Sequence, residues 1–97
     1  MEYEWDENKR SSNLLKHGLD FLAADLVLSS QYCLNVKSQR HNELRTQSFA
    51  YVFDVLAVLT VVYYPGKQCR IISFRRASRD EREVYHEWLE NDYKDSK

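Results

Sequence analysis

The chain is poor in the residues that build phosphate loops, metal sites and cross-links. Its 97 residues include two glycines, one proline and two cysteines. No Gly-rich phosphate loop, His-Glu-x-x-His motif or Gly-x-Ser-x-Gly elbow is present, so nucleotide hydrolases, zinc proteases and serine hydrolases find no support. Cys33 and Cys69 lie in apolar, strand-like stretches without metal-ligand spacing. We therefore expect two buried thiols, with no metal and no structural disulfide.

Long apolar segments are missing as well. Met1–Arg10 is acidic and has no apolar core, so it is unlike a signal peptide, and we expect a cytoplasmic protein. The longest apolar run, Val55–Tyr64, has about half of the roughly 20 residues that a membrane helix needs. It reads as a buried strand. Without linkers or repeats, residues 1–97 are expected to form a single domain with one core.

Charge is distributed unevenly along a chain whose net charge is only -1. Gly66–Arg82 contains six basic residues against two acids, whereas Glu83–Lys97 contains five acids against two bases. Five of the basic residues are arginines, at positions 70, 75, 76, 79 and 82. Because the guanidinium fork matches phosphate and stays charged at physiological pH, this segment predicts a local anion-binding surface.

Helix signals occur at both ends of the chain. Asp6 can cap a helix over Glu7–His17, and Gly18 suits the left-handed position just past its end. Asp20 can cap a second helix ending near Ser29–Ser30. In that helix, apolar residues recur at helical spacing: Phe21, Leu22, Ala24, Leu26 and Leu28. The two helices would form a hairpin at Gly18.

A capping box of Ser78 and Glu81 predicts a last helix that begins at Arg79. Its apolar stripe is expected to pack on a sheet and comprises Val84, Tyr85, Trp88 and Leu89. The end of the chain, Asp95-Ser96-Lys97, should fray.

The middle of the chain favours strands. Four segments are rich in β-branched and aromatic residues: Tyr32–Lys37, Leu44–Phe53, Val55–Tyr64 and Cys69–Arg76. Pro65-Gly66 matches a type II turn. Val55–Tyr64 lacks polar alternation and should be a central strand covered on both faces. Glu2–Trp5 offers a further short strand. The prediction is an α+β fold with two N-terminal helices, a four-stranded antiparallel sheet and a C-terminal helix.

An ordered set of short motifs resembles the BrnT toxin family. The motifs are Trp5-Asp6, Lys9, Asn13, Lys16-His17-Gly18, Phe21, Ala24, Glu43-x-Arg45, Arg70-Ile71-Ile72-Ser73, Arg75-Arg76-Ala77, Arg79, Glu81 and Tyr85. The resemblance implies a RelE-like fold and ribonuclease activity as the toxin of a type II toxin-antitoxin pair. It also implies a cognate antitoxin with a ribbon-helix-helix DNA-binding region. The chain would contact DNA only through this antitoxin.

Two departures from the family pattern leave a second function open. The family has a glycine where this chain has Gln47-Ser48-Phe49-Ala50, and a small residue in place of Phe74. The alternative is a catalytically inactive member that binds the antitoxin within a DNA-bound autoregulatory complex.

RNA cleavage without a metal needs a base for the 2′-hydroxyl proton, a cation for the phosphate oxygens and an acid for the leaving group. Arg75 and Arg76 are the candidates for phosphate stabilisation, and strand alternation sends one to each face of the sheet. His17 follows the end of a helix, whose dipole would raise the pKa of the imidazole and suit a general acid. Equally, His17 could cap carbonyls beside Gly18.

The other candidate catalytic residues have strong structural explanations. Glu81 could act as a base, although its capping-box position already accounts for it. Tyr85 is on the apolar stripe, where a core residue with a hydrogen-bonded hydroxyl is expected. His41 and His86 are expected to be solvated. The predicted substrate-binding residues are Arg79, Arg70, Arg45, Lys16 and Lys9, with Trp5, Tyr63 and Tyr64 as surfaces on which bases could stack. For Arg70 and Arg82, ordinary surface charge is the competing explanation.

Overall fold

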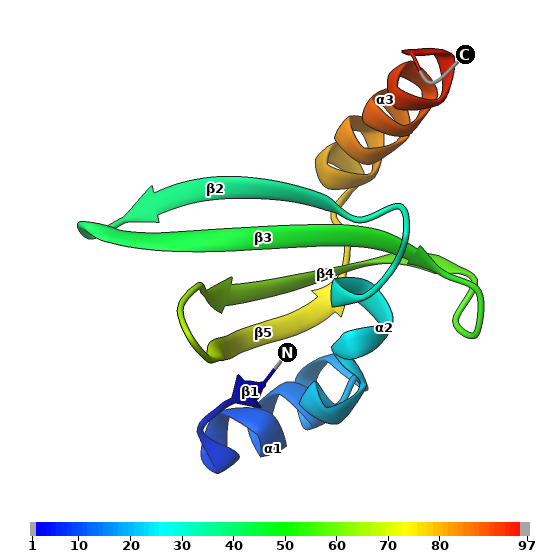
Figure 1. The fold of residues 1–97 in the computed structure, drawn as a ribbon. Coiled ribbons are helices and arrows are strands. Elements are labelled where there is room, and N and C mark those ends of the chain that lie inside the picture. Colours follow the sequence, from blue (N-terminus) through cyan, green and yellow to red (C-terminus); the bar gives the residue numbers. More distant parts are fainter. Residues whose placement is uncertain (1, 96–97) are drawn as a thin grey trace.

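The computed structural model describes residues 2–95, with side chains placed through Asn91. It is an α+β fold of three helices, one 3₁₀ turn and five strands (Figure 1). In chain order the elements are β1 (Tyr3–Glu4), α1 (Glu7–His17), a 3₁₀ turn (Phe21–Ala23), α2 (Asp25–Leu28), β2 (Leu34–Arg40), β3 (Glu43–Val52), β4 (Ala57–Tyr64), β5 (Cys69–Arg76) and α3 (Arg79–Asp95). The fraying expected of Ser96 and Lys97 lies outside the described residues.

The strands form one sheet in the order β1-β5-β4-β3-β2. The four long strands are antiparallel, as predicted. The sheet is nevertheless mixed, because β1 pairs in parallel with the start of β5. Tyr3 and Glu4 of β1 lie opposite Cys69 and Arg70. The predicted four-stranded antiparallel sheet is therefore correct for its long strands and incomplete at one edge.

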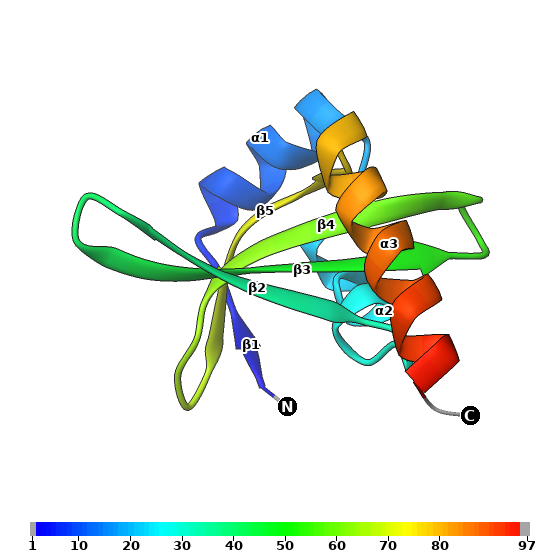
Figure 2. The same cartoon turned by 90° about the horizontal axis from the view of Figure 1, so that it is seen from above.

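The core has two layers, one on each face of the sheet (Figures 1 and 2). On the face covered by α2, here called the α2 face, Phe21 and Val27 pack against Leu59, Val61 and Phe74. On the opposite face, the α3 face, the buried residues are Phe49, Val58, Ala77 and Tyr85. β4 contributes to both layers, and every residue from 58 to 62 is buried. This confirms the predicted central strand covered on both faces.

The helix ends follow the sequence signals closely. Asp6 accepts hydrogen bonds from the backbone of Asn8 and Lys9 at 2.8 and 3.3 Å, and Gly18 ends α1 with φ of 70°. At α3, the Ser78 N–H donates to Glu81 Oε1 at 2.9 Å and the Glu81 N–H donates to Ser78 Oγ at 3.2 Å. Both caps and the start of α3 at Arg79 are confirmed.

The segment after Gly18 differs from the predicted second helix. Asp20 does cap it, but the segment consists of a 3₁₀ turn and a four-residue α2. Phe21, Ala24 and Val27 are buried three residues apart, a spacing that fits 3₁₀ geometry better than a full α-helix. Leu22 and Leu26, which were placed on the apolar stripe, are exposed. The three-residue spacing therefore determines which side chains of this segment are buried against the sheet.

Turn geometry shifts several strand boundaries from those predicted. His41 and Asn42 both adopt left-handed φ, at 53° and 65°, and join Arg40 directly to Glu43 in a two-residue hairpin. Two-residue hairpin turns with left-handed φ usually contain Asn-Gly, so the sequence His41-Asn42 did not indicate this turn. Val55 and Leu56 complete the next turn, in which the Leu56 N–H donates to Val52 at 2.8 Å, and β4 begins only at Ala57.

The predicted type II turn at Pro65-Gly66 is wrong. Gly66 lacks the positive φ that the third position of this turn requires, and residues 65–68 all lie between β4 and β5. Along α3, Val84 is half exposed and does not join the packed stripe of Tyr85, Trp88 and Leu89. The packed stripe is therefore narrower than predicted, and Figure 2 shows that α3 runs across the strands.

α1 is held against β5 by one buried carboxamide. Asn13 donates from Nδ2 to the Phe74 carbonyl at 2.8 Å and to the Leu19 carbonyl at 2.9 Å. The Phe74 N–H donates to Asn13 Oδ1 at 3.1 Å. Asn13 thus pairs with the outer edge of β5 beyond the point where β1 ends, as a neighbouring strand would.

Replacing this carboxamide should destabilise the fold. Asn13→Ala leaves the N–H and C=O of Phe74 buried without partners, so the free energy of unfolding should fall by roughly 2–3 kcal/mol. Urea unfolding followed by circular dichroism measures the change. Ser11→Ala, an exposed substitution on the same helix, is the control and should alter stability by less than about 0.5 kcal/mol. Equal stability of the two variants would show that Asn13 does not hold α1 in place.

Candidate functional site

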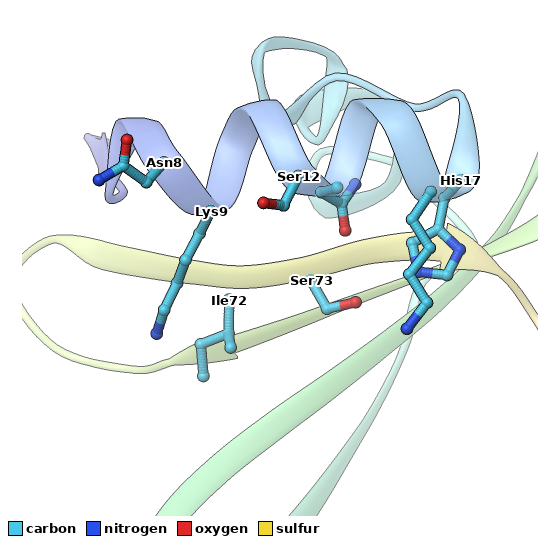
Figure 3. Close-up of a pocket in the computed structure, with 8 residues that line it drawn as sticks. Asn8, Lys9, Ser12, His17, Ile72 and Ser73 are labelled. Carbon is cyan, nitrogen blue, oxygen red and sulfur yellow. The ribbon is translucent and has the colours of Figure 1, made fainter.

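A groove of about 400 Å³ lies between α1 and β5. Its walls are formed by Asn8, Lys9, Ser12, Asn13, Lys16 and His17 from the helix and by Ile72 and Ser73 from the strand. Figure 3 shows Lys9 and His17 near opposite ends, with Ser12 between them above Ser73. The groove therefore presents cationic and hydroxyl groups along the outer edge of the sheet.

Helical periodicity explains how the α1 side of the groove is built. Lys9, Asn13 and Lys16 recur at intervals of four and three residues, which places them on one face of a helix. Asn13 turns this face toward β5 through its bonds with Phe74. The lysines flanking Asn13 are thereby brought beside the strand.

The β5 side is shaped by an irregularity in the sheet. The β4–β5 register shifts between Val62 and Tyr63, so Ile72 is left out of the regular pairing. Ser73 follows it and faces the same side of the sheet as Arg75, two residues further on. The groove thus opens toward the α3 face, close to the end of the strand.

His17 has a lowered pKa, contrary to the sequence-based expectation. Partial burial lowers the pKa of the imidazole first, and the positive charges of Lys16 and Arg75 lower it further. These causes act in the direction opposite to the rise that was expected from the helix dipole. A neutral imidazole at neutral pH suits a general base better than a general acid.

Arg75 is held by a bidentate ion pair with Glu81. The two guanidinium nitrogens lie 2.7 and 2.9 Å from the two carboxylate oxygens, and the side chains are 27% and 15% exposed. Glu81 also accepts from Thr60 Oγ1 at 3.1 Å and from the backbone of Ser78 at 2.9 Å. One carboxylate therefore joins β4, β5 and the start of α3.

The hydrogen bonds to Glu81 decide its protonation. Although burial raises its pKa, the bonds from Arg75, Ser78 and Thr60 together lower it to about 2. A carboxylate that is so weakly basic and fully engaged has little capacity to take a proton from a ribose hydroxyl. The geometry supports the structural explanation of Glu81.

The five clustered arginines do not form one surface. Arg75 and Arg76 face opposite sides of the sheet, as strand alternation predicted: Arg75 lies across from Thr60, and Arg76 from Leu59. Arg70 is at the other end of β5, roughly 20 Å from Arg76 at the rise of a β-strand. The anion-binding surface expected from Arg70, Arg75, Arg76, Arg79 and Arg82 is therefore divided among separate parts of the fold.

Three of these arginines have local partners of their own. Arg70 lies 3.8 Å from Glu4, and Arg79, largely exposed, pairs with Glu83 at 3.4 Å. Arg82 donates to the Ala77 carbonyl at 2.9 Å. These contacts match ordinary surface charge, which the sequence offered as the competing explanation for Arg70.

A family model supplies the comparison with known proteins. Residues 5–81 match the model of the ribonuclease toxin BrnT of type II toxin-antitoxin systems. The chain belongs to the BrnT toxin family. No curated protein sequence matches the chain. Family membership implies an antitoxin partner, and the match spans α1, strands β2 to β5 and the start of α3. Within residues 2–95, no helix is both long and apolar enough to cross a membrane.

Arg45 lies outside the groove between α1 and β5, on the part of the sheet nearest the β2–β3 hairpin. Its guanidinium lies 5.5 Å from the centre of the Tyr64 ring and donates to the Tyr64 hydroxyl at 3.3 Å. That hydroxyl donates in turn to Glu43. Arg45 Nε is buried and has no hydrogen-bond partner among the described residues. The structure does not bring Arg45 together with Lys9 and Lys16.

Tyr85 is fully buried and its hydroxyl is already used. It donates to the Tyr32 carbonyl at 2.7 Å and accepts from the Tyr51 N–H at 3.3 Å. Burial raises its pKa. These contacts fasten α3 to β3 and to the segment before β2, so the geometry favours the core role over the catalytic one.

Sequence reasoning missed three residues that shape the groove. Asn13 was noted only as part of a motif, and Ser12 and Ser73 were not considered as site residues. The period of Lys9, Asn13 and Lys16 along the first helix is a signal that could have found this face. Asn13 pairs with Phe74, which is 61 residues away in sequence, so no local sequence signal indicated this contact.

Replacing Glu81 tests the ion pair. Glu81→Gln removes the charge but keeps the shape, so the free energy of unfolding at pH 7 should fall by roughly 2–3 kcal/mol. Because the pKa of folded Glu81 is about 2 and its ordinary value is 4.5, this stabilisation is present above pH 4.5 and is lost as pH falls toward 2. Urea unfolding at several pH values should show wild type and variant converging in acid.

The control for this comparison is Glu83→Gln, which removes an exposed carboxylate from the same helix. It should change stability by less than about 0.5 kcal/mol at any pH. A constant gap between wild type and Glu81→Gln from neutral to acidic pH would contradict the lowered pKa.

Proposed function

We propose that this BrnT-family chain is a RelE-like endoribonuclease whose RNA-binding site is the groove between α1 and β5. Supporting this is the placement of His17, its pKa lowered by burial and by Lys16 and Arg75, in one groove with Lys9 and Lys16. Such a groove offers a base beside cations, which phosphodiester cleavage requires. The antitoxin partner is proposed to carry a ribbon-helix-helix region and to provide the contact with DNA.

The proposed reaction uses the ribose of the RNA as nucleophile. Neutral His17 takes the 2′-hydroxyl proton, and the 2′-oxygen attacks phosphorus. The bond to the 5′-oxygen breaks, that oxygen takes a proton from solvent in the open groove, and the protonated His17 releases its proton to solvent. The products are a 2′,3′-cyclic phosphate and a 5′-hydroxyl. Lys9 and Lys16 bind the phosphate oxygens, and Arg75, fixed by Glu81, adds positive charge at the end of the groove.

The first test is RNA cleavage by the purified, antitoxin-free chain at low salt in the presence of EDTA. Cleavage is expected, and Lys9→Ala/Lys16→Ala should reduce its rate at least about tenfold because phosphate binding loses charge-assisted contacts. The salt dependence of RNA binding should also weaken in that variant. The control, Lys37→Ala/Lys67→Ala, removes two exposed lysines elsewhere and should cleave at the wild-type rate. Equal activity of both double variants would place the site outside this groove.

The pH dependence tests His17 directly. A base must be neutral, so kcat/KM should be flat at pH 7 and above and should fall only below the ordinary histidine pKa of 6.5. His17→Gln should lower the rate by about 10² to 10⁴ and abolish this acid limb. If kcat/KM still falls at low pH in His17→Gln, a group other than His17 is responsible for that fall.

A second candidate function rests on the Arg75–Glu81 pair. Because the Arg75 guanidinium is already paired with the Glu81 carboxylate, the site is also consistent with a family member that binds its antitoxin without cleaving RNA. Tight antitoxin binding together with no cleavage of total RNA, with or without ribosomes, would favour this binding module over the nuclease.

A further inference from the structure

β2 is the outermost strand at one edge of the sheet (Figure 1). Among the described residues its only neighbouring strand is β3. β2 runs for seven residues, Leu34–Arg40, without proline, glycine or a shift in register. At the rise of a β-strand this makes a regular edge about 24 Å long. The backbone groups along such an edge are a template to which another extended polypeptide can add.

The hairpin turn fixes which backbone groups of β2 point outward. The two-residue turn joins Arg40 and Glu43 as a hydrogen-bonded pair, and such pairs alternate along an antiparallel ladder. Every second residue of β2, counted back from Arg40, therefore bonds to β3. The residues between them turn their N–H and C=O groups away from β3, and these are Asn35, Lys37 and Gln39. Their side chains are exposed as well, so the edge is open at all three positions.

The α3 face of β2 offers apolar surface to an added strand. Leu34 and Val36 pack against the core layer on this face, yet neither is fully buried. A strand paired with β2 would lie beside both side chains and cover more of their surface. Apolar residues on the same face of that strand would be buried with them, as in the rest of this layer.

The charge of the β2–β3 hairpin favours an acidic partner on the other face. Lys37 is exposed and, within the described part of the chain, takes part in no ion pair. The segment Leu34–Phe49 contains three lysine or arginine residues and one acid. That acid, Glu43, already accepts a hydrogen bond from the Tyr64 hydroxyl. A carboxylate on the neighbouring strand would therefore be complementary to Lys37.

A second copy of this chain fits the edge less well. Antiparallel pairing of two complete β2 strands about a two-fold axis sets Lys37 directly opposite its own counterpart. Like charges in this position are destabilising, and a lysine at the centre of an edge strand is a common protection against self-pairing. The partner is thus a different polypeptide, and family membership implies one in the antitoxin.

We propose that an extended segment of the cognate antitoxin adds to β2 as a further strand of the sheet. Its backbone bonds to the outward N–H and C=O groups of Asn35, Lys37 and Gln39. Apolar side chains of the segment lie beside Leu34 and Val36, and a carboxylate lies beside Lys37. The identity of the partner rests on family membership, and the site is independent of RNA cleavage because no residue of β2 lines the α1–β5 groove.

The first test is amide hydrogen exchange in the isotope-labelled full chain, followed by NMR with and without the purified product of the antitoxin reading frame adjacent to its gene. In the free chain, the amides of Asn35, Lys37 and Gln39 should exchange fast because they face solvent. The antitoxin should slow their exchange at least about tenfold. The amides of Val36 and Ser38, which bond to β3, are the internal control and should exchange slowly in both states. Unchanged exchange at the three outward amides of the complex would overturn the proposal.

The second test is the affinity of variants at Lys37 for the same antitoxin, measured by calorimetry. Lys37→Pro removes one outward donor and places a ring against the added strand, so binding should weaken at least about tenfold. The fold should tolerate this proline because the N–H takes no part in pairing with β3, and circular dichroism checks it. Lys37→Ala, the matched control, keeps the N–H and should weaken binding less than about fivefold. Lys37→Glu should weaken binding more than Lys37→Ala does, because it places two carboxylates together.

RNA cleavage by the Lys37 variants without antitoxin separates this edge from the nuclease, and it should match that of the wild type. Alternating protection of β2 in a chain that cleaves no RNA would support strand addition and refute the nuclease. Equal antitoxin affinity of Lys37→Pro and Lys37→Ala, or no binding by the wild type, would overturn strand addition. A loss of RNA cleavage in Lys37→Ala would overturn it in favour of RNA as the ligand of this edge.

Discussion

The outer edge of β5 is the constraint on which the rest of the site depends. A strand at the edge of a sheet has backbone N–H and C=O groups that need partners. β1 provides them for only the first residues of β5. Further along, the Asn13 carboxamide pairs with both groups of Phe74. Meeting this requirement places α1 along the strand, and the groove with its two lysines and His17 is the consequence.

The Glu81 carboxylate performs a comparable task at the other end of β5. It caps α3, accepts from Thr60 on β4 and binds Arg75 on β5. Its hydrogen bonds outweigh burial and keep it ionised, which in turn keeps Arg75 paired and oriented. Burial and Lys16 are the larger causes of the lowered pKa of His17, and Arg75, held in place by Glu81, contributes to it as well. A capping residue in the sequence thus turns out to organise the electrostatics of the candidate site.

Local signals predicted local structure well and distant contacts poorly. The caps at Asp6, Gly18 and Ser78 could be predicted from the sequence because each involves residues within one helical turn. The hairpin at His41-Asn42 escaped because its left-handed backbone is imposed by strand pairing and not by glycine. The arginine cluster misled for the same reason: closeness in sequence along β5 means opposite faces and opposite ends in space. The lowered pKa of His17 required knowing that its imidazole is partly buried and that Arg75, 58 residues away in sequence, lies near it.

The Glu81 carboxylate also joins β5 to the last helix. It binds Arg75 on β5 and caps α3, the helix that carries Tyr85 and Leu89. Tyr85 in turn fastens α3 to β3 and to the segment before β2. A partner that shifts α3 would therefore also disturb Arg75, which gives a bound antitoxin a physical route to the cationic groove without entering it.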